Sequence, residues 1–256
     1  MNSFHTYSFP NAKSVVVCGD IHGEFNAVIY KLCIQYQMTD TLLIVAGDCG
    51  FGFDKPGYYD SVFNRNSSRL LSKANNWVVM VRGNHDNPAY FQEERIHHER
   101  FRCIPDYSVL QACGHNILCV GGAVSIDRDY RKKYDSRHLR SDVASYWADE
   151  MPVYNEEALN DISKDLQIDT VITHTAPSFC ELISKDGLTE WATLDPDIPS
   201  DCAKERETMD KIYNHLKLAR HPVSHWYYGH FHQTWNSEID GVLFSMLDIM
   251  EFKEIR

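Results

Sequence analysis

The stretch Ser14-Val-Val-Val-Cys-Gly-Asp-Ile-His-Gly23 joins a short apolar run to a polar segment flanked by two glycines. A continuous run of mostly β-branched residues of this length is typical of a strand buried on both faces. The glycines permit positive φ angles and close backbone approach, so Asp20 and His22 can both turn toward one ion. A turn that uses Asp and Gly only for its shape is the alternative. We therefore predict a buried strand that ends in two candidate metal ligands.

The same pattern, an apolar strand that ends in Asp, Asn or His, recurs along the chain. We expect strands over residues 14–18, 42–46, 77–81, 116–120, 170–173 and 224–228, helices after residue 23 and over 202–220, and a hairpin that turns at Asp240-Gly241. In α/β sheets, ligands bind at the carboxyl ends of the strands. Polar clusters that lie far apart in the sequence can therefore meet at one site.

The polar clusters carry groups that bind metals. Asn84 offers a neutral amide oxygen, and His85 can act as an acid or a base. His230 and His232 stand at alternate positions, which point the same way in an extended chain. Mixed carboxylate, imidazole and amide ligands suit divalent manganese, iron, zinc or nickel. Seven ligands are too many for one ion but suit two ions that share a carboxylate, and the candidates are Asp20, His22, Asp48, Asn84, His174, His230 and His232.

The weaker of these motifs have ordinary explanations when each is taken alone. Gly47-Asp48 after a strand is usually just a turn, and a single histidine such as His174 is more often a core or surface imidazole. Together, however, the motifs use five of the thirteen histidines, each at the end of a predicted strand. The joint pattern therefore favours a metal site.

Composition limits the class of protein. The chain of 256 residues is 43% hydrophobic and 24% charged, which is ordinary for a globular protein. Its formal net charge of −11 argues against a general nucleic-acid binder, which needs a cationic surface. No apolar run approaches the roughly 18 residues of a membrane span, and the first ten residues lack the features of a secretory signal. We expect a cytoplasmic protein whose eight cysteines are thiols.

The ordered motifs Asp-x-His, Gly-Asp, Gly-Asn-His-Asp, His and Gly-His-x-His, from Asp20 to His232, resemble the calcineurin-like metallophosphoesterase superfamily. The resemblance implies an α/β fold of four layers, in which two mixed β-sheets pack as a sandwich flanked by helices, with the metals at the loop ends. It also implies two groups of ligands on either side of a bridging Asp48: Asp20, His22 and His232 for one ion, and Asn84, His174 and His230 for the other. His85 takes the place of the family's catalytic imidazole.

The second motif departs from the phosphoprotein phosphatase branch, which has Gly-Asp-x-Val-Asp-Arg-Gly. Here Phe51 replaces the aspartate that orients the catalytic histidine, and Gly52 replaces the phosphate-binding arginine. We therefore do not expect a serine/threonine phosphatase. Asp86 and Asp127 are the candidates for orienting His85.

Substrate contacts are predicted from basic residues near these motifs. Arg82 could contact phosphate or form a structural salt bridge. Six basic residues lie between Arg128 and Arg140, and of these Arg128 and Arg131 could cradle an anionic substrate, since planar guanidinium groups favour phosphate. The alternative for this segment is a solvated helical face. We expect one domain over residues 1–256, with segments 128–165 and 176–206 as lids over the metals.

The function that follows is the hydrolysis of a small phosphorylated substrate, either a phosphomonoester or a phosphodiester. We expect a hydroxide shared by two divalent ions to attack phosphorus, and His85 to give a proton to the leaving oxygen. A nuclease or cyclic-nucleotide phosphodiesterase would use the same ligands, and so would a nucleotide pyrophosphatase acting on dinucleoside polyphosphates. A scaffold without activity is also conceivable, but such members usually lose ligands that this chain keeps.

Overall fold

The strands of the computed structural model, which describes residues 4–63, 66–137, 143–180 and 187–255, form two β-sheets. The smaller sheet has the order β12-β2-β3-β4-β5. Its neighbours β2 to β5 are parallel, and β12 is antiparallel to β2. The strands are β2 (Ser14–Cys18), β3 (Thr41–Val45), β4 (Trp77–Met80), β5 (Phe101–Cys103) and β12 (Phe252–Glu254).

The larger sheet has the order β1-β6-β7-β8-β9-β11-β10 and is also mixed. Its central strands β7, β8, β9 and β11 are parallel, whereas β6 and β7 pair antiparallel. The predicted hairpin is confirmed, because β10 and β11 are antiparallel and are joined at Asp240-Gly241. The strands are β1 (His5–Ser8), β6 (Ser108–Ala112), β7 (His115–Val120), β8 (Thr170–Thr173), β9 (His225–Tyr228), β10 (Trp235–Ile239) and β11 (Val242–Met246).

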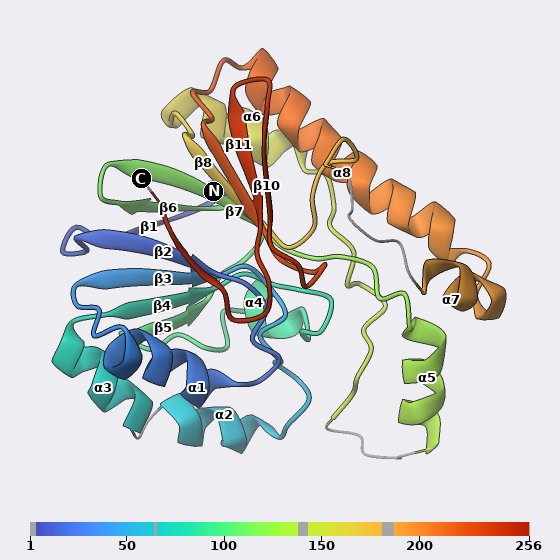
Figure 1. Cartoon of the computed structure of the whole chain (residues 1–256), viewed down its shortest axis with the longest axis horizontal. Coiled ribbons are helices and arrows are strands. Elements are labelled where there is room, and N and C mark those ends of the chain that lie inside the picture. The colour runs from blue at the N-terminus through green and yellow to red at the C-terminus, as the bar shows by residue number, and fades with distance from the viewer. Residues whose placement is uncertain (1–3, 64–65, 138–142, 181–186, 256) are drawn as a thin grey trace.

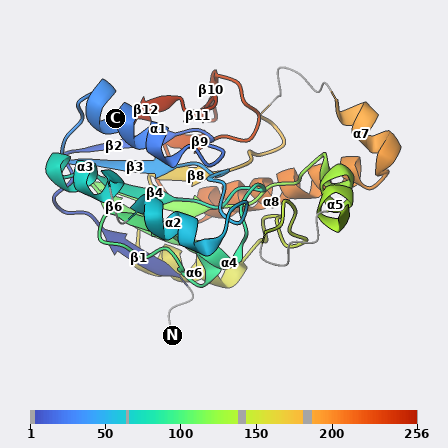
Figure 2. The ribbon, with the colours of Figure 1, turned by 90° about the horizontal axis from the view of Figure 1, so that it is seen from below.

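Helices cover the outer face of each sheet (Figure 1). The smaller sheet is covered by α1 (Phe25–Tyr30), which continues as a π-helical turn (Lys31–Gln35), and by α2 (Pro56–Phe63), α3 (Asn66–Ala74) and α4 (Ala89–Gln92). The larger sheet is covered by α6 (Glu156–Asp165) and α8 (Ile198–Leu218). Two further helices, α5 (Arg128–Arg137) and α7 (Leu188–Leu194), lie beyond the sheets at one end of the molecule in both views (Figures 1 and 2). The predicted four-layer α/β sandwich is confirmed.

Alternation along the strands produces three apolar layers. In β2, Val15 and Val17 face the other sheet, whereas Val16 and Cys18 face the helices of the smaller sheet. In β8, Ile172 lies between the sheets and Val171 lies beneath α6 and α8. Because successive side chains of a strand point to opposite faces, a strand buried on both sides must be apolar throughout. The continuous apolar runs of the sequence therefore correspond to strands of the two sheets, which are the inner two layers of the four-layer fold.

The predicted elements agree with the structure except at some boundaries. Each predicted strand is present within one residue of its expected ends. The helix predicted over residues 202–220 begins earlier, at Ile198, because Pro199 is tolerated in the first turn, where no backbone N–H partner is needed. All eight cysteines are free thiols. In the part of the chain that the structure describes, no helix is long and apolar enough to cross a membrane.

The segments expected as lids are only partly separate from the core. Helix α6, within segment 128–165, buries Leu159 and Ile162 against the larger sheet and is therefore part of the outer layer. The start of α8 buries Ile198 completely. Residues 138–142 and 181–186 of the two segments lie outside the described residues.

A buried carboxylate on α8 holds two loops that follow strands. Glu205 accepts hydrogen bonds from the backbone N–H of Val124 (2.5 Å), after β7, and from the Thr175 hydroxyl (3.1 Å), after β8. Burial raises the pKa of Glu205 from 4.5 to about 7, against the effect of these hydrogen bonds. The protonated carboxyl is therefore favoured more in the folded chain than in the unfolded chain.

We predict that Glu205 makes folding stability depend on pH. Because the folded pKa is raised, the stabilisation is fully present below pH 4.5 and is lost as the pH rises to about 7. A difference of this size corresponds to roughly 3 kcal/mol. In urea unfolding of the metal-free protein, the wild type should lose about this much relative to Glu205→Gln over that pH range.

The control is Glu207→Gln, an exposed position on the same helix. It should leave the pH dependence of the free energy of unfolding unchanged. If Glu205→Gln kept the wild-type pH dependence, the proposed titration of Glu205 would be wrong.

Candidate metal centre

The polar clusters meet where the two sheets face each other. Asp20, Asp48 and Asn84 follow β2, β3 and β4 of the smaller sheet, and His174 and His230 follow β8 and β9 of the larger sheet. Within each sheet these strands are parallel, so their carboxyl ends lie at one edge. The loops are also bonded across the gap, since the backbone N–H of His230 donates to Asp20 Oδ1 (3.0 Å).

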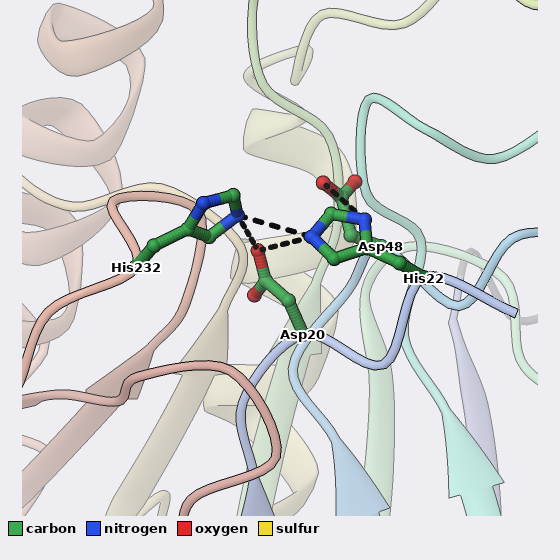
Figure 3. Close-up of side chains that lie close together, drawn as sticks. All are labelled: Asp20, His22, Asp48 and His232. Carbon is green, nitrogen blue, oxygen red and sulfur yellow. Dashed lines mark hydrogen bonds and ion pairs between the residues drawn. The ribbon is translucent and has the colours of Figure 1, made fainter. Parts of the chain in front are cut away.

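One group of side chains surrounds Asp20 (Figure 3). His232 Nε2 lies 2.9 Å from Asp20 Oδ2 and 3.1 Å from His22 Nε2. His22 Nδ1 lies 4.0 Å from Asp48 Oδ2. One ligand atom from each of these four residues lies within 4.8 Å of the others, so the group could hold a metal ion.

A second group lies on the other side of Asp48. His174 Nε2 is 3.0 Å from Asn84 Oδ1 and 3.1 Å from Asp48 Oδ1. His174 Nδ1 lies 2.7 Å from the backbone carbonyl of Ala46, to which it donates. A histidine that donates one ring N–H to a carbonyl presents its other nitrogen as a metal ligand. The ring of His230 packs beside His174, with 5.0 Å between the centroids.

Four of the seven candidate ligands have left-handed backbone conformations. The φ angles are 44° for His22, 47° for Asp48, 69° for His230 and 51° for His232. Positive φ is uncommon for residues other than glycine and costs of order 1–3 kcal/mol. Such conformations persist when the surrounding structure demands them, and they cluster at functional sites.

A buried carboxylate ties the second and third motif loops together. Asp86 accepts hydrogen bonds at 2.7–3.0 Å from the backbone N–H groups of Cys49, Gly50, Phe51 and Gly83. Burial and the charge of Asp48 raise its pKa to about 6, although these N–H groups oppose the shift. Its oxygens are directed at the backbone. Asp86 is therefore a support for the loops and does not orient His85 as the sequence had suggested.

The donor set fits divalent cations. The carboxylates of Asp20 and Asp48 are completely buried, and Asp20 Oδ2 accepts no hydrogen bond of good geometry despite the nearby His232 ring. Burial lowers the pKa of His174, but Asp48 and Asp20 outweigh this effect and raise the pKa to about 10. Both facts indicate buried negative charge that requires positive charge beside it.

His85 lies at the edge of this cluster and is in contact with a guanidinium group. Its Nε2 is 3.9 Å from Asp48 Oδ2, and Arg131 Nη2 of α5 donates to the same nitrogen. Burial and Arg131 lower the pKa of His85 to about 4, against the opposing charge of Asp48. Asp127, the other candidate for orienting His85, pairs with Arg131 Nε at 2.8 Å, and its charge opposes the lowering of the His85 pKa.

A chain of hydrogen bonds that the sequence did not reveal supports Asn84. The Asn84 amide Nδ2 donates to Ser125 Oγ (3.0 Å), and Ser125 Oγ donates to Glu150 Oε2 (2.6 Å). The Ser125 backbone N–H also donates to Glu150 Oε1 (2.7 Å), and both residues are buried. The chain directs Asn84 Oδ1 toward His174. The sequence analysis placed Glu150 in the predicted lid segment 128–165 but identified neither Ser125 nor Glu150 as a residue of the site.

Two of the predicted substrate residues have other partners. Arg82 is buried, donates to the carbonyl of Glu150 (2.7 Å) and pairs with Asp106 (2.8 Å). Arg128 is bound by Asp195 and Asp201, each at 2.7 Å, and so joins α5 to α7 and α8. The structure therefore brings neither guanidinium to the cluster, whereas it does bring that of Arg131. Arg140 lies outside the described residues.

One family model and a set of solved structures match this chain. A search of curated proteins gave no significant match. Among solved structures, 26 chains match significantly. One is a phosphopantetheinyl hydrolase from Mycobacterium tuberculosis, with 16% identity, a TM-score of 0.44 and coverage of 92% of this chain and 89% of that one. Another is a candidate 5'-nucleotidase from Staphylococcus aureus, with 11% identity and a TM-score of 0.41; the match covers 92% of this chain but 48% of that longer one. The family model for calcineurin-like phosphoesterases matches residues 13–234, and this chain belongs to that family of metal-dependent phosphoesterases.

Proposed function

We propose that the chain hydrolyses a small phosphate ester at a centre of two divalent metal ions, with Asp48 between them. The observation that carries this proposal is the position of the Asp48 carboxylate. One oxygen is 3.1 Å from His174 Nε2, and the other is 4.0 Å from His22 Nδ1. Asp48 thus contacts both groups of candidate ligands.

The ligand assignment follows these two groups. Asp20, His22 and His232 would hold one ion. Asn84, His174 and His230 would hold the other, with manganese, iron, zinc or nickel as suitable metals for this mixture of oxygen and nitrogen ligands. When bound, two such ions would lower the pKa of a water molecule and neutralise phosphoryl oxygens.

The chain's own residues would then position the ester and supply the proton. His85 lies next to Asp48 and would give a proton to the leaving oxygen. Without substrate, its pKa is lowered to about 4 by burial and by Arg131. A negatively charged phosphoryl group would attract the Arg131 guanidinium and would also favour protonated His85, so substrate binding itself would raise this pKa.

Recognition of the rest of the substrate is assigned to the parts of the predicted lids that are not in the core. Among the described residues, these parts are α5, residues 143–149 and α7. Arg131 is the residue of this region that contacts the site, since it reaches His85 and also donates to the backbone carbonyl of Ser145 (3.2 Å). The whole of residues 1–256 would act as one domain.

Removal of the metals tests the function directly. Protein treated with a chelator should be inactive on a panel of phosphomonoesters and phosphodiesters, and one or more of the four metals should restore turnover with two ions bound per chain. Asp48→Asn should bind fewer than two ions, because the shared carboxylate is lost. The exposed Asp165→Asn on α6 is the control. Elemental analysis that finds one ion in the active wild type would contradict the binuclear centre.

His85→Ala tests proton donation to the leaving group. With an alkyl ester, kcat should fall by about 10²–10⁴, the usual contribution of general acid catalysis. With a p-nitrophenyl ester the loss should be much smaller, because that leaving group departs without a proton. Metal content should stay unchanged, and the exposed His97→Ala should behave as wild type. Equal losses on both esters would exclude this role.

Ser125→Ala tests the support of Asn84. The substitution removes the acceptor for the Asn84 amide and leaves Glu150 without its hydroxyl partner, so we expect metal affinity to fall about 10- to 100-fold, as is typical when such supports are lost. Competition with a chelating dye measures this affinity. Ser136→Ala on the exposed face of α5 is the matched control. Unaltered affinity in Ser125→Ala would show that the chain does not position Asn84.

A further inference from the structure

We propose that Phe53 and Trp147 form a subsite for a flat aromatic group on the alcohol side of the substrate. The natural substrate would then be a phosphate ester whose alcohol carries an aromatic or heteroaromatic ring. This inference rests on the proposed function, because it assigns the leaving group to the side of the site where His85 lies. The chemistry of the ring, rather than a particular metabolite, is what the site would recognise.

The two rings lie directly beside the candidate catalytic imidazole. The ring centroids of Phe53 and His85 are 5.9 Å apart at an interplanar angle of 75°, so the rings meet edge to face. Phe53 and Trp147 are stacked, with centroids 5.9 Å apart and an angle of 28°. Both side chains are partly exposed. A continuous aromatic surface therefore extends outward from His85.

This surface comes from two segments that other contacts hold together. Gly52 has a φ of 105°, and a Cβ there would lie 2.6 Å from the six-membered ring of Trp147. The missing side chain lets the indole lie against the backbone of the loop. On the other segment, Arg131 donates to the carbonyl of Ser145, two residues before Trp147. This hydrogen bond connects the guanidinium beside His85 to the segment that carries the indole.

The position of His85 determines which part of the substrate would meet the rings. A proton donor must lie within hydrogen-bonding reach of the leaving oxygen. The group attached to that oxygen then extends away from the metals and past His85, where Phe53 and Trp147 lie. Among the described residues, neither ring belongs to the three apolar layers of the fold. Partly exposed aromatic rings can bind flat π-systems by stacking or edge-to-face contact.

Equilibrium binding separates this inference from the function on which it rests. Benzylphosphonate and cyclohexylmethylphosphonate have the same charge and similar size, differ in aromaticity, and cannot be hydrolysed at an ester bond. In calorimetric titrations of the manganese-loaded wild type, the benzyl compound should bind about three- to tenfold more tightly, as expected for an aromatic pair beyond simple burial. If the protein showed this preference but hydrolysed no ester, the proposed function would be wrong and the aromatic subsite would still be supported.

Substitutions then test which residues cause the higher affinity for benzylphosphonate. Trp147→Ala and Phe53→Ala should weaken benzylphosphonate binding by about tenfold and bring the ratio of the two affinities close to one. Trp147→Phe should retain most of the preference, because it keeps an aromatic face. Tyr130→Ala, which removes an exposed aromatic ring from the same helix as Arg131, should leave both affinities unchanged.

Two results would overturn the inference. The first is equal affinity of the wild type for the benzyl and cyclohexylmethyl compounds. The second concerns the Trp147 variants. It is an equal loss of affinity for both compounds in Trp147→Ala, together with an equal recovery for both compounds in Trp147→Phe. The second result would mean that Trp147 only anchors residues 143–151 over the loop that contains Gly52.

Discussion

Two carboxylates that are completely removed from water, Asp20 and Asp48, impose the main constraint on this molecule. An ionised carboxylate in an apolar interior is strongly unfavourable unless positive charge or hydrogen-bond donors lie beside it. Backbone N–H groups of His85 and His230 supply part of this compensation. The imidazoles around the two groups supply ligand atoms, and divalent ions would supply the remaining charge. The family to which the chain belongs and the geometry of the site thus agree on a metal-dependent centre.

The rest of the fold keeps these groups in place at a cost to the backbone. Four candidate ligands adopt positive φ, and the loops that carry them are held by buried polar side chains. Asp86 binds the backbone of the second and third motifs, whereas Glu205 holds the loops after β7 and β8 against α8. These supports come from positions as far apart in the sequence as residues 86 and 205. The site is therefore a property of the complete sandwich.

The second motif shows how this chain differs from the phosphoprotein phosphatase branch. Phe51, at the position of the aspartate in that branch, is buried among Phe25, Tyr59 and Tyr90 and contributes to the core. Gly52, at the position of the arginine, leaves room for Trp147. A guanidinium reaches His85 from α5 instead, through Arg131. In this chain the positive charge beside His85 therefore belongs to α5, and Trp147 lies against the second-motif loop.

Much of the architecture could be predicted from local sequence. Runs such as Ser14–Cys18 and Thr170–Thr173 are apolar on both faces. This pattern is typical of a buried strand in a layered α/β fold. The ordered motifs identified Asp20, His22, Asp48, Asn84, His174, His230 and His232 as candidate ligands. They lie together because parallel strands end at one edge, and that rule can be applied without coordinates.

What the sequence alone determined was therefore the strands that lead to the candidate site, the family and the candidate ligands, because these depend on short-range patterns of apolar and polar residues. Which residues surround the ligands was decided only by tertiary structure. Ser125 and Glu150 support Asn84, Asp86 turns to the backbone, and of the three predicted arginines only Arg131 contacts His85. A long polar side chain such as arginine can pair with any acid within its reach, and the acids near Arg82 and Arg128 come from segments that only the folded chain brings close. Contacts between residues so far apart in the sequence leave no local pattern from which they could be read.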